Sequence, residues 1–557
     1  MNINANKKKN AACLSLAAIL FIFIVVPVIT VFIRAVVNED GCLNFSSAVN
    51  TIANSENMQT IINSLLLGTV VVIISSIIAF PLAFFLAKTR LARHKWLDIV
   101  LMIPFMTPPY ISSMGWILFM QKKGLFQQLF PSTGDFSQGF FSFFGLALIM
   151  SLHVFPFMTT ILKNALLNID NSLNESAAVC GGGFFYRLRR VTLALLKGNY
   201  AIGVLLVFVK TLSEYGTPAT FGRKIGFYVF TTDIHRYATT APIDFGKSAG
   251  LSSVLVTICM AMWLVQSYIT NKNTYNLVGG KGRKNFSVSN GFRVELLGGV
   301  YIGLILFLAI GIPYFAVIVT SLIKLRGYGM TAGNYTLAHY SLLFTENPKA
   351  VNAMGTSFFL AVISATLASV LGTLTVAVTH KMKRFKKIIM AQTLLPEMLP
   401  NIVLVIGFMI FWNKLYKILP IYNTIWFMVL VFTMMFLPYS VQYVSSAIMQ
   451  MNDNLIQAAR VSGGDSLYIF RRITFPLILK GMVSGWMMIF IIVFRELVAS
   501  SLIAPPDTLT VSTFIVREFE QGSVSTGMAM AVICVLLTTT ALIALNQLTS
   551  RKKGATH

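Results

Sequence analysis

Long apolar runs separated by short polar segments follow one another along the whole chain. A helix needs about 20 mostly apolar residues to cross the hydrocarbon core of a bilayer, and these runs reach that length. They lie at 12–33, 61–87, 97–120, 139–161, 199–221 and 249–270, and again at 296–323, 353–379, 389–412, 421–445, 482–503 and 526–548. The pattern predicts an all-α polytopic membrane protein with about 12 transmembrane helices.

The second half of the sequence repeats the first. Pro104, Met106 and Pro108 recur as Pro396, Met398 and Pro400, and residues 175–196 recur as 457–478 with nine of 22 positions identical. We therefore predict two tandem six-helix units, residues 1–290 and 291–557. Because each unit has six spans, the repeats are parallel and related by an axis along the membrane normal, where a transport path is expected.

Composition and charge agree with a membrane protein. The chain is 56% hydrophobic and 11% charged, against about 25% charged in a typical soluble domain. The net charge of +25 does not indicate nucleic-acid binding, because the basic residues stand in short clusters between apolar runs. Lys and Arg are retained on the cytoplasmic side during insertion, so these clusters predict that both termini are cytoplasmic. The clusters include Lys88, Arg90, Arg93 and Lys95; Lys281, Arg283 and Lys284; Lys381, Lys383, Arg384, Lys386 and Lys387; and Arg551, Lys552 and Lys553.

No catalytic or metal-binding motif stands out. The five cysteines form no CxxC pair, and the histidines are scattered, so we expect no disulfide framework, zinc site or other metal site. The segment Ala241–Ser248 ends in GKS but has alanine where a phosphate-binding loop opens with glycine. We expect neither an enzyme nor a nucleotide site in this chain.

A long polar loop follows the fourth span of each repeat, at 163–198 and 446–481. The loops contain ESAAVCGGGFFYRLRRVTLALL and QAARVSGGDSLYIFRRITFPLI. Ser172 precedes Glu175 by three residues, as Asn454 precedes Gln457, and this capping-box spacing predicts the start of a short helix outside the membrane. The following glycine pairs predict its end. The alternative is a basic amphipathic loop that rests on lipid headgroups.

The two loops resemble the signature loop of permease subunits of bacterial ATP-binding-cassette importers. That signature reads E-A-A, three residues, G, nine residues, I-x-L-P. Two departures are Gln457 in place of the acidic residue and Ala194 in place of the proline. In this family the loop forms a coupling helix that docks on the ATPase subunit. The residues assigned to ATPase coupling by this resemblance are Glu175, Ser176, Ala177, Gly181 and Gly182, and Gln457, Ala458, Ala459, Gly463 and Gly464.

The resemblance implies a type I importer fold that works by alternating access. It implies a bacterial inner-membrane location and two separate ATPase subunits, which bind ATP and Mg, so that this chain needs no cofactor of its own. It also implies an extracytoplasmic binding protein that docks on the outer loops, near 222–248, 324–350 and 505–525. Lipid is the only other expected partner, and nucleic acid is not expected.

Fused permeases of two six-span halves are most similar to the ferric-iron importer family. Thiamine and 2-aminoethylphosphonate permeases are similar relatives and remain alternatives for the substrate. The prediction is ferric iron. A more distant alternative is an ion-coupled secondary transporter, which also favours repeated spans but needs no cytoplasmic docking loop.

Three acidic residues are candidates for the translocation path. Glu214 and Glu496 occupy equivalent positions near the ends of the fifth spans, and carboxylate oxygens suit a hard trivalent cation. A charge within a membrane is costly unless paired or hydrated, and Lys210 and Arg495 are close enough in sequence to neutralise the two acids locally.

Glu397 is the third candidate. It lies between Pro396 and Pro400, in a span that two prolines are expected to break, and broken spans are tolerated where the freed backbone faces a cavity. Its counterpart in the first repeat is Phe105, so a site here would be asymmetric. A simple kink with a solvated acid at the edge of the span is the alternative.

Overall fold

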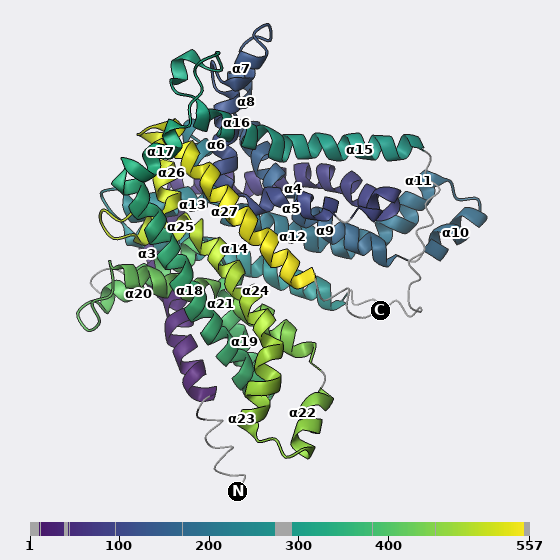
Figure 1. The fold of residues 1–557 in the computed structure, drawn as a ribbon, viewed down its shortest axis with the longest axis vertical. Helices are drawn as coiled ribbons and strands as arrows, with labels where there is room; N and C mark the ends of the chain where they lie inside the picture. The colour runs from purple at the N-terminus through teal and green to yellow at the C-terminus, as the bar shows by residue number, and fades with distance from the viewer. Residues whose placement is uncertain are drawn as a thin grey trace. The chain divides into compact units, whose positions relative to one another are not determined.

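The computed structural model describes residues 11, 13–37, 43, 45–94, 96–169, 171–272, 292–380, 383–451 and 453–550. These residues form helices joined by short turns (Figure 1), and the only strand-like pairings among them are the isolated bridges Val37–Leu43 and Ile323–Tyr335. The predicted all-α class is confirmed. The predicted repeat boundary at 290/291, and several of the basic clusters around Lys281 and Arg551, lie outside the described residues.

Ten helices are long and apolar enough to cross a membrane, and two bent helix pairs raise the number to as many as 12. The ten spans are Cys13–Val36, Ser55–Lys88, Phe143–Asn168, Phe185–Ser213, Phe245–Thr270, Phe292–Leu322, Pro348–Thr379, Ile425–Met449, Phe470–Phe494 and Val524–Leu545. Each contains or overlaps one of the predicted apolar runs. The hydrophobic pattern therefore locates the spans correctly.

The spans are built from the following named elements. Those of the first repeat are η1 (Phe21–Val25) with α2 (Val26–Val36), α4 (Ser55–Lys88), α5 (Trp96–Met106) with α6 (Pro109–Met120), α9 (Phe143–Asn168), η3 (Leu188–Thr192) with α12 (Leu193–Ser213), and α14 (Phe245–Lys272). Those of the second are α15 (Phe292–Leu306) with η5 (Phe307–Gly311) and α16 (Ile312–Leu322), α18 (Pro348–His380), α19 (Lys383–Met398) with α20 (Asn401–Lys414), α21 (Ile425–Met449), η7 (Phe470–Thr474) with α24 (Phe475–Phe494), and α27 (Val524–Ser550).

Shorter helices connect these spans. They are α3 (Phe45–Ala53), η2 (Arg90–Arg93), α7 (Leu125–Leu129), α8 (Ser137–Phe140), α10 (Asn171–Val179), α11 (Phe184–Arg187), η4 (Pro218–Gly222), α13 (Phe230–Thr239), η6 (Arg326–Tyr328), α17 (Ala338–Thr345), α22 (Asp453–Val461), α23 (Ser466–Ile469), α25 (Val498–Ile503) and α26 (Val511–Glu520).

The third span of each repeat is broken, as the prolines predict. The axes of α5 and α6 differ by 85°, and those of the chain from Phe385 to Met398 and of α20 differ by 111°. The breaks fall at Pro108 and Pro400, which are the N-cap residues of α6 and α20. Proline lacks a backbone N–H and disfavours helical geometry in the residue before it, so a new helix starts there more readily than the old one continues.

The fifth spans end earlier than predicted. The expected ends were residues 221 and 503, but α12 stops at Ser213 and α24 at Phe494. The apolar pattern continues past both points because the chain forms a second, separate helical piece, η4 in the first repeat and α25 in the second. Glu214 and Glu496 consequently lie in the connection between two helices instead of inside one.

The described helices form two compact units that do not follow the order of the sequence. Unit 1 comprises residues 1–51, 234–253 and 337–557, and unit 2 comprises residues 52–233 and 254–336. The first span of each sequence repeat is therefore exchanged, since α2 belongs to unit 1 with the second-repeat helices and α16 belongs to unit 2 with the first-repeat helices.

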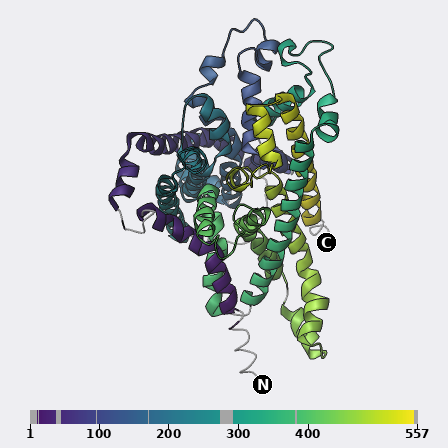
Figure 2. The ribbon, with the colours of Figure 1, turned by 90° about the vertical axis from the view of Figure 1, so that its left-hand side faces the viewer.

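Two close backbone contacts hold the exchanged helices in place. In unit 1, α2 packs on α20, as Figure 2 shows, and a Cβ atom added to Gly407 would come within 2.5 Å of the Pro27 carbonyl oxygen. In unit 2, α16 packs on α6, and a Cβ atom on Gly115 would lie 2.5 Å from the Pro313 carbonyl oxygen. Small residues at such positions let membrane helices approach closely, and here the same device occurs in both units.

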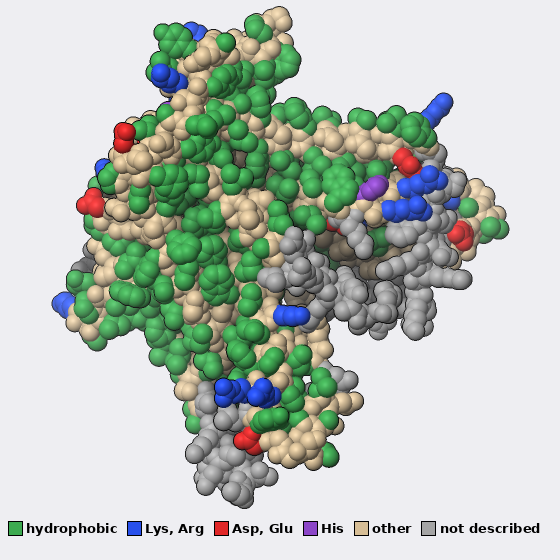
Figure 3. Space-filling model, in the orientation of Figure 1, with side chains coloured by type: hydrophobic (Ala, Val, Ile, Leu, Met, Phe, Trp, Pro, Cys, Tyr) green, Lys and Arg blue, Asp and Glu red, His purple; other side chains and the backbone are tan. Residues whose placement is uncertain are grey.

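Large apolar side chains cover much of the exterior of the helices. Figure 3 shows hydrophobic side chains over much of the face that it draws, with few Lys, Arg, Asp or Glu side chains among them. Ile77 is 65% exposed, and Val300 and Leu536 are each 62% exposed. Such exposure along spanning helices fits contact with lipid chains.

Candidate functional site

Each predicted coupling loop contains a short helix outside the spans. These are α10 and α22, both nine residues long. The helices begin at Asn171 and Asp453, one residue before Ser172 and Asn454, so those two residues lie in the first turn instead of at the predicted cap. The prediction of a helix is confirmed, and its start is corrected by a shift that is common at helix ends.

Both helices end in the same glycine turn. The Gly182 N–H donates to the Ala177 carbonyl at 2.8 Å and the Gly181 N–H to the Ala178 carbonyl at 3.0 Å. In the second repeat, Gly464 donates to Ala459 at 2.9 Å and Gly463 to Arg460 at 3.1 Å. This pair of bonds is a Schellman motif, which requires a left-handed residue at the position of the first glycine.

The backbone angles explain why glycine is needed there. Gly181 has φ of 82° and Gly463 has φ of 84°, and no other atom lies within 4 Å of a Cβ atom built on either residue. Space is therefore not the constraint. An L-amino acid with a side chain pays about 1–2 kcal/mol to adopt this conformation, so the turn selects glycine through the backbone.

The residues predicted to couple to an ATPase are mostly exposed. Glu175 and Ser176 are exposed on α10, as are Gln457 and Ala458 on α22, while Ala177 and Ala459 are half-buried. Val179 and Val461, which occupy equivalent positions at the ends of the two helices, are each 88% exposed. Figure 1 shows α10 and α22 beyond the ends of the long helices in their respective units.

The carboxylate of Glu214 binds the turn that follows it. Both of its oxygens accept a hydrogen bond from the Thr217 N–H, each at 3.1 Å, and the Glu214 carbonyl accepts one from the Thr231 hydroxyl at 2.8 Å. The carboxylate thus supplies an acceptor for the start of η4, where helical N–H groups have no intrahelical partner.

The carboxylate of Glu496 binds the start of the following helix in the same way, through more hydrogen bonds. Its oxygens accept from the N–H groups of Val498 at 3.0 Å, Ala499 at 2.8 Å and Ser500 at 3.2 Å, all at the start of α25. Its carbonyl accepts from the hydroxyl groups of Ser500 and Ser512. Glu496 is only 7% exposed, so these bonds supply much of the solvation that a buried carboxylate needs.

A buried serine ties each of these regions to the second span of its repeat. The Ser64 hydroxyl accepts from the Phe230 N–H at 2.8 Å, and the Ser357 hydroxyl accepts from the Val511 N–H at 2.8 Å. We call each set, consisting of the glutamate, the serine and the residues they bind, a loop latch. Both serines stand near the start of a predicted second span, at 61–87 and 353–379, but only the structure shows what they bind.

Glu397 lies at the break in the third span of the second repeat. Its carboxylate accepts a hydrogen bond from the Gln442 amide on α21, and both side chains are exposed. The described residues hold no group of three or more His, Cys, Asp and Glu residues suited to a metal ion. A convergence of Glu214, Glu496 and Glu397 around one path therefore stays a prediction.

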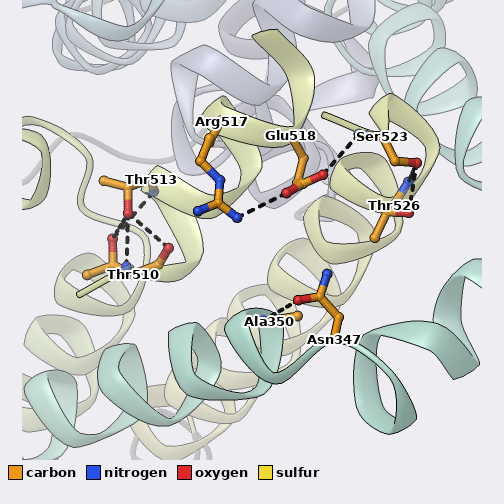
Figure 4. Close-up of polar contacts among 8 residues, drawn as sticks. All are labelled: Asn347, Ala350, Thr510, Thr513, Arg517, Glu518, Ser523 and Thr526. Atoms are coloured by element: carbon orange, nitrogen blue, oxygen red, sulfur yellow. Dashed lines mark hydrogen bonds and ion pairs between the residues drawn. The ribbon is translucent and has the colours of Figure 1, made fainter. Parts of the chain in front are cut away.

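One polar cluster of unit 1 was not anticipated from the sequence (Figure 4). Glu518 accepts from the Arg517 guanidinium at 3.2 Å and from the Ser523 N–H at 2.9 Å, while Thr510 and Thr513 form a capping box at the start of α26. These bonds shape the segment 505–525, one of the loops expected to meet a binding protein. The signal for it was the spacing of Thr510 and Thr513 before an amphipathic stretch.

Comparison with known proteins shows which proteins this chain is similar to. Residues 364–554 match the family described as "Binding-protein-dependent transport system inner membrane component". The ferric transport system permease protein FbpB of Actinobacillus pleuropneumoniae is 24% identical over 545 residues, which cover 94% of this chain and 76% of the relative. Putative ferric transport system permease protein FbpB 1 of Haemophilus influenzae is 24% identical over 513 residues, covering 89% of this chain and 78% of the relative.

Two further matches each cover about half of this chain. The spermidine/putrescine permease PotB of Haemophilus influenzae is 26% identical over 281 residues, which cover 97% of that protein but 49% of this chain. A crystal structure of a bacterial ABC transporter involved in import of the acidic polysaccharide alginate covers 46% of this chain and 96% of its own, with 17% identity. Its TM-score of 0.36 is too low to support an argument about the fold. The resemblance to importer permeases inferred from the two loops is confirmed by the matches in sequence.

Proposed function

We propose that this chain, which carries the inner-membrane-component domain of binding-protein-dependent transport systems, is the fused transmembrane subunit of an importer that moves ferric iron into the cytoplasm. In this proposal ATP-driven closure of two ATPase subunits is transmitted to the spans, which alternate between outward-facing and inward-facing states. The chain itself performs no catalysis. ATP and Mg bind the ATPase subunits, and this chain needs no cofactor.

The observation that carries the proposal is the duplicated coupling helix. α10 and α22 lie outside the spans, expose equivalent residues and end in the same left-handed glycine turn. A loop that only connected two spans would not require a short helix with the same left-handed glycine turn in both repeats. A secondary transporter driven by an ion gradient would have no use for such a pair.

The substrate is inferred from the relatives and is consistent with the chemistry of the chain. Two relatives that align with most of this chain are named as ferric transport permeases. The carboxylates of Glu214, Glu496 and Glu397 are oxygen donors of the kind that hard trivalent cations prefer. In the loop latches, Glu214 and Glu496 are engaged with backbone N–H groups, so Glu397, at the break of the third span, is the acid with the most freedom to meet a passing cation.

The same proposal includes the membrane in which the chain lies, its orientation there and the side on which each partner binds. The chain lies in a bacterial inner membrane with both termini in the cytoplasm, which puts α10 and α22 on the side where ATP is found. An extracytoplasmic binding protein docks on the opposite side, at 222–248, 324–350 and 505–525. The hydrogen bonds around Glu518 support this assignment, since they give the last of these segments a fixed shape.

Reconstitution tests the proposal. The chain is combined with its ATPase subunits in lipid nanodiscs, and ATP hydrolysis is measured after addition of binding protein loaded with Fe³⁺, 2-aminoethylphosphonate or thiamine. We expect Fe³⁺-loaded protein to stimulate hydrolysis several-fold over empty protein. Stimulation by one of the organic ligands instead would reassign the substrate, and no dependence on any binding protein would reject the importer.

A further inference from the structure

The fifth span of each repeat is longer than the hydrocarbon core of a bilayer. The continuous helices Phe185–Ser213 and Phe470–Phe494 have 29 and 25 residues. At about 1.5 Å per residue they extend about 43 Å and about 37 Å, whereas the core is about 30 Å thick. If the C-terminal end of each helix lies at one face of the hydrocarbon core, its N-terminal turns extend beyond the other face. These turns contain η3 and η7, which therefore reach the layer of lipid headgroups.

A pair of exposed arginines occupies each of these protruding turns. Arg189 and Arg190 lie in η3, and Arg471 and Arg472 lie in η7. Among the described residues, no ion pair involves any of the four. The sequence from 176 to 213 and from 466 to 494 also contains no Asp or Glu, so no acid on the same helix compensates the charge.

Exposed aromatic side chains accompany both pairs. Phe185 is 81% exposed and Tyr186 is 59% exposed before the first pair, while Tyr468 is 57% exposed and Phe470 is 42% exposed before the second. Aromatic rings of this kind gather at the membrane–water interface, where their apolar part meets the acyl chains and their polar part stays hydrated. In unit 1, Figure 3 shows Lys and Arg side chains towards the end where Figure 1 places α23.

We propose that these two segments, Phe185–Arg190 and Tyr468–Arg472, are binding sites for the headgroups of anionic phospholipids. The guanidinium pair binds the phosphate oxygens through charge-assisted hydrogen bonds, and the aromatic rings pack on the upper part of the acyl chains. Free phosphate offers nothing to the aromatic rings. The ATPase subunit is a less fitting partner, because it is expected on α10 and α22, on the other side of the glycine turn from these segments.

Binding of this kind fixes the depth of each fifth span. The headgroup site and the coupling helix are joined only by the short glycine turn. A segment held at the headgroups therefore limits how far the start of the fifth span can shift when α10 or α22 is displaced. The inference does not depend on the identity of the substrate.

The test uses the whole chain in detergent, without ATPase, and measures its melting temperature on addition of mixed micelles. Micelles that contain phosphatidylglycerol are compared with micelles that contain phosphatidylcholine. We expect a stabilising shift with phosphatidylglycerol alone. Replacing all four arginines (Arg189→Gln, Arg190→Gln, Arg471→Gln and Arg472→Gln) raises the phosphatidylglycerol concentration needed for half of that shift by about tenfold or more, since each exposed basic residue contributes to attraction by an anionic surface.

Two control variants keep the result interpretable. The corresponding four Arg→Lys changes retain the charge and should keep most of the response, and Lys122→Gln with Lys123→Gln removes two exposed charges elsewhere and should leave it unchanged. An undiminished response in the four-fold glutamine variant would overturn the proposal. A variant that responds normally to phosphatidylglycerol but no longer binds the ATPase would assign the arginines to that subunit instead.

Discussion

Gly181 and Gly463 are the residues on which the coupling turn depends most directly. A side chain at either position forces an unfavourable left-handed backbone, at a cost of about 1–2 kcal/mol for alanine and more for a β-branched residue. We predict that Gly181→Val with Gly463→Val lowers ATP-dependent uptake at least tenfold while the amount of protein in the membrane stays the same. Gly183→Ala is the matched control, because Gly183 lies in the same loop, has open space around its Cβ position and does not have a positive φ. Normal uptake in the double valine variant would argue against the turn's role.

The two latch glutamates allow a prediction that separates structure from transport. Glu496 accepts bonds from three backbone N–H groups and Glu214 from one, and hydrogen bonds to charged groups contribute about 1.5–3 kcal/mol each. Glu496→Gln should therefore lower the melting temperature more than Glu214→Gln. Equal shifts would mean that the bonds around Glu496 do not stabilise the fold as the geometry indicates.

Glu397 provides the complementary case, since it contributes one side-chain bond at an exposed position. We expect Glu397→Gln to leave the melting temperature within about 1 °C of the parent and to reduce Fe³⁺ uptake several-fold. Gln442→Glu, which places a second acid beside the first, should also leave the protein folded. Unchanged uptake in Glu397→Gln would remove Glu397 from the proposed path.

Among the helices, the exchanged first spans depend on two close backbone approaches. A methyl group on Gly407 would meet the Pro27 carbonyl, and one on Gly115 the Pro313 carbonyl, at distances that real Cβ atoms do not adopt. Gly407→Ala and Gly115→Ala should each destabilise the protein by about 1–3 kcal/mol, the usual cost of overpacking, and should be detected as a lower melting temperature. Gly303→Ala on α15 is the control, because its Cβ position is open. If all three glycine-to-alanine variants have the same melting temperature, the close helix contacts at Gly407 and Gly115 do not contribute to the stability of the protein.

The helices also show what the sequence could and could not reveal. Apolar runs located the spans because length and hydropathy are local properties, and the prolines located the breaks for the same reason. The exchange of α2 and α16 between repeats could not be predicted, because it depends on which distant surfaces fit together. The ends of α12 and α24 were placed too late, because the apolar pattern continues into η4 and α25. The carboxylates of Glu214 and Glu496 bind the backbone N–H groups at the start of those second helices, and nothing in the sequence indicated these bonds. Of the site, the coupling loops were predicted from a repeated motif, whereas the latch serines needed the structure to give them a partner.

For the molecule as a whole, the proposed mechanism is mechanical: two short helices, one from each repeat, receive the movement of an ATPase and pass it to the spans that follow. Each coupling helix is joined through a glycine turn to its fifth span, and each fifth span ends in a latch that holds the second span and the following helix. A displacement at α10 or α22 is therefore expected to reach the far end of its span without being absorbed in a flexible joint.

Site-specific photo-crosslinking tests this mechanism. A photoreactive amino acid replaces Val179 in one variant and Val461 in another, since both side chains are 88% exposed at the ends of the coupling helices. The same substitution at Ile418 is the control, because Ile418 is 80% exposed in the turn between α20 and α21, which lies on the outer side when both termini are cytoplasmic. In the assembled transporter, the first two variants should crosslink to the ATPase subunits and the third should not. Crosslinks from Val179 and Val461 to lipid alone, or to no protein, would show that α10 and α22 do not contact the ATPase.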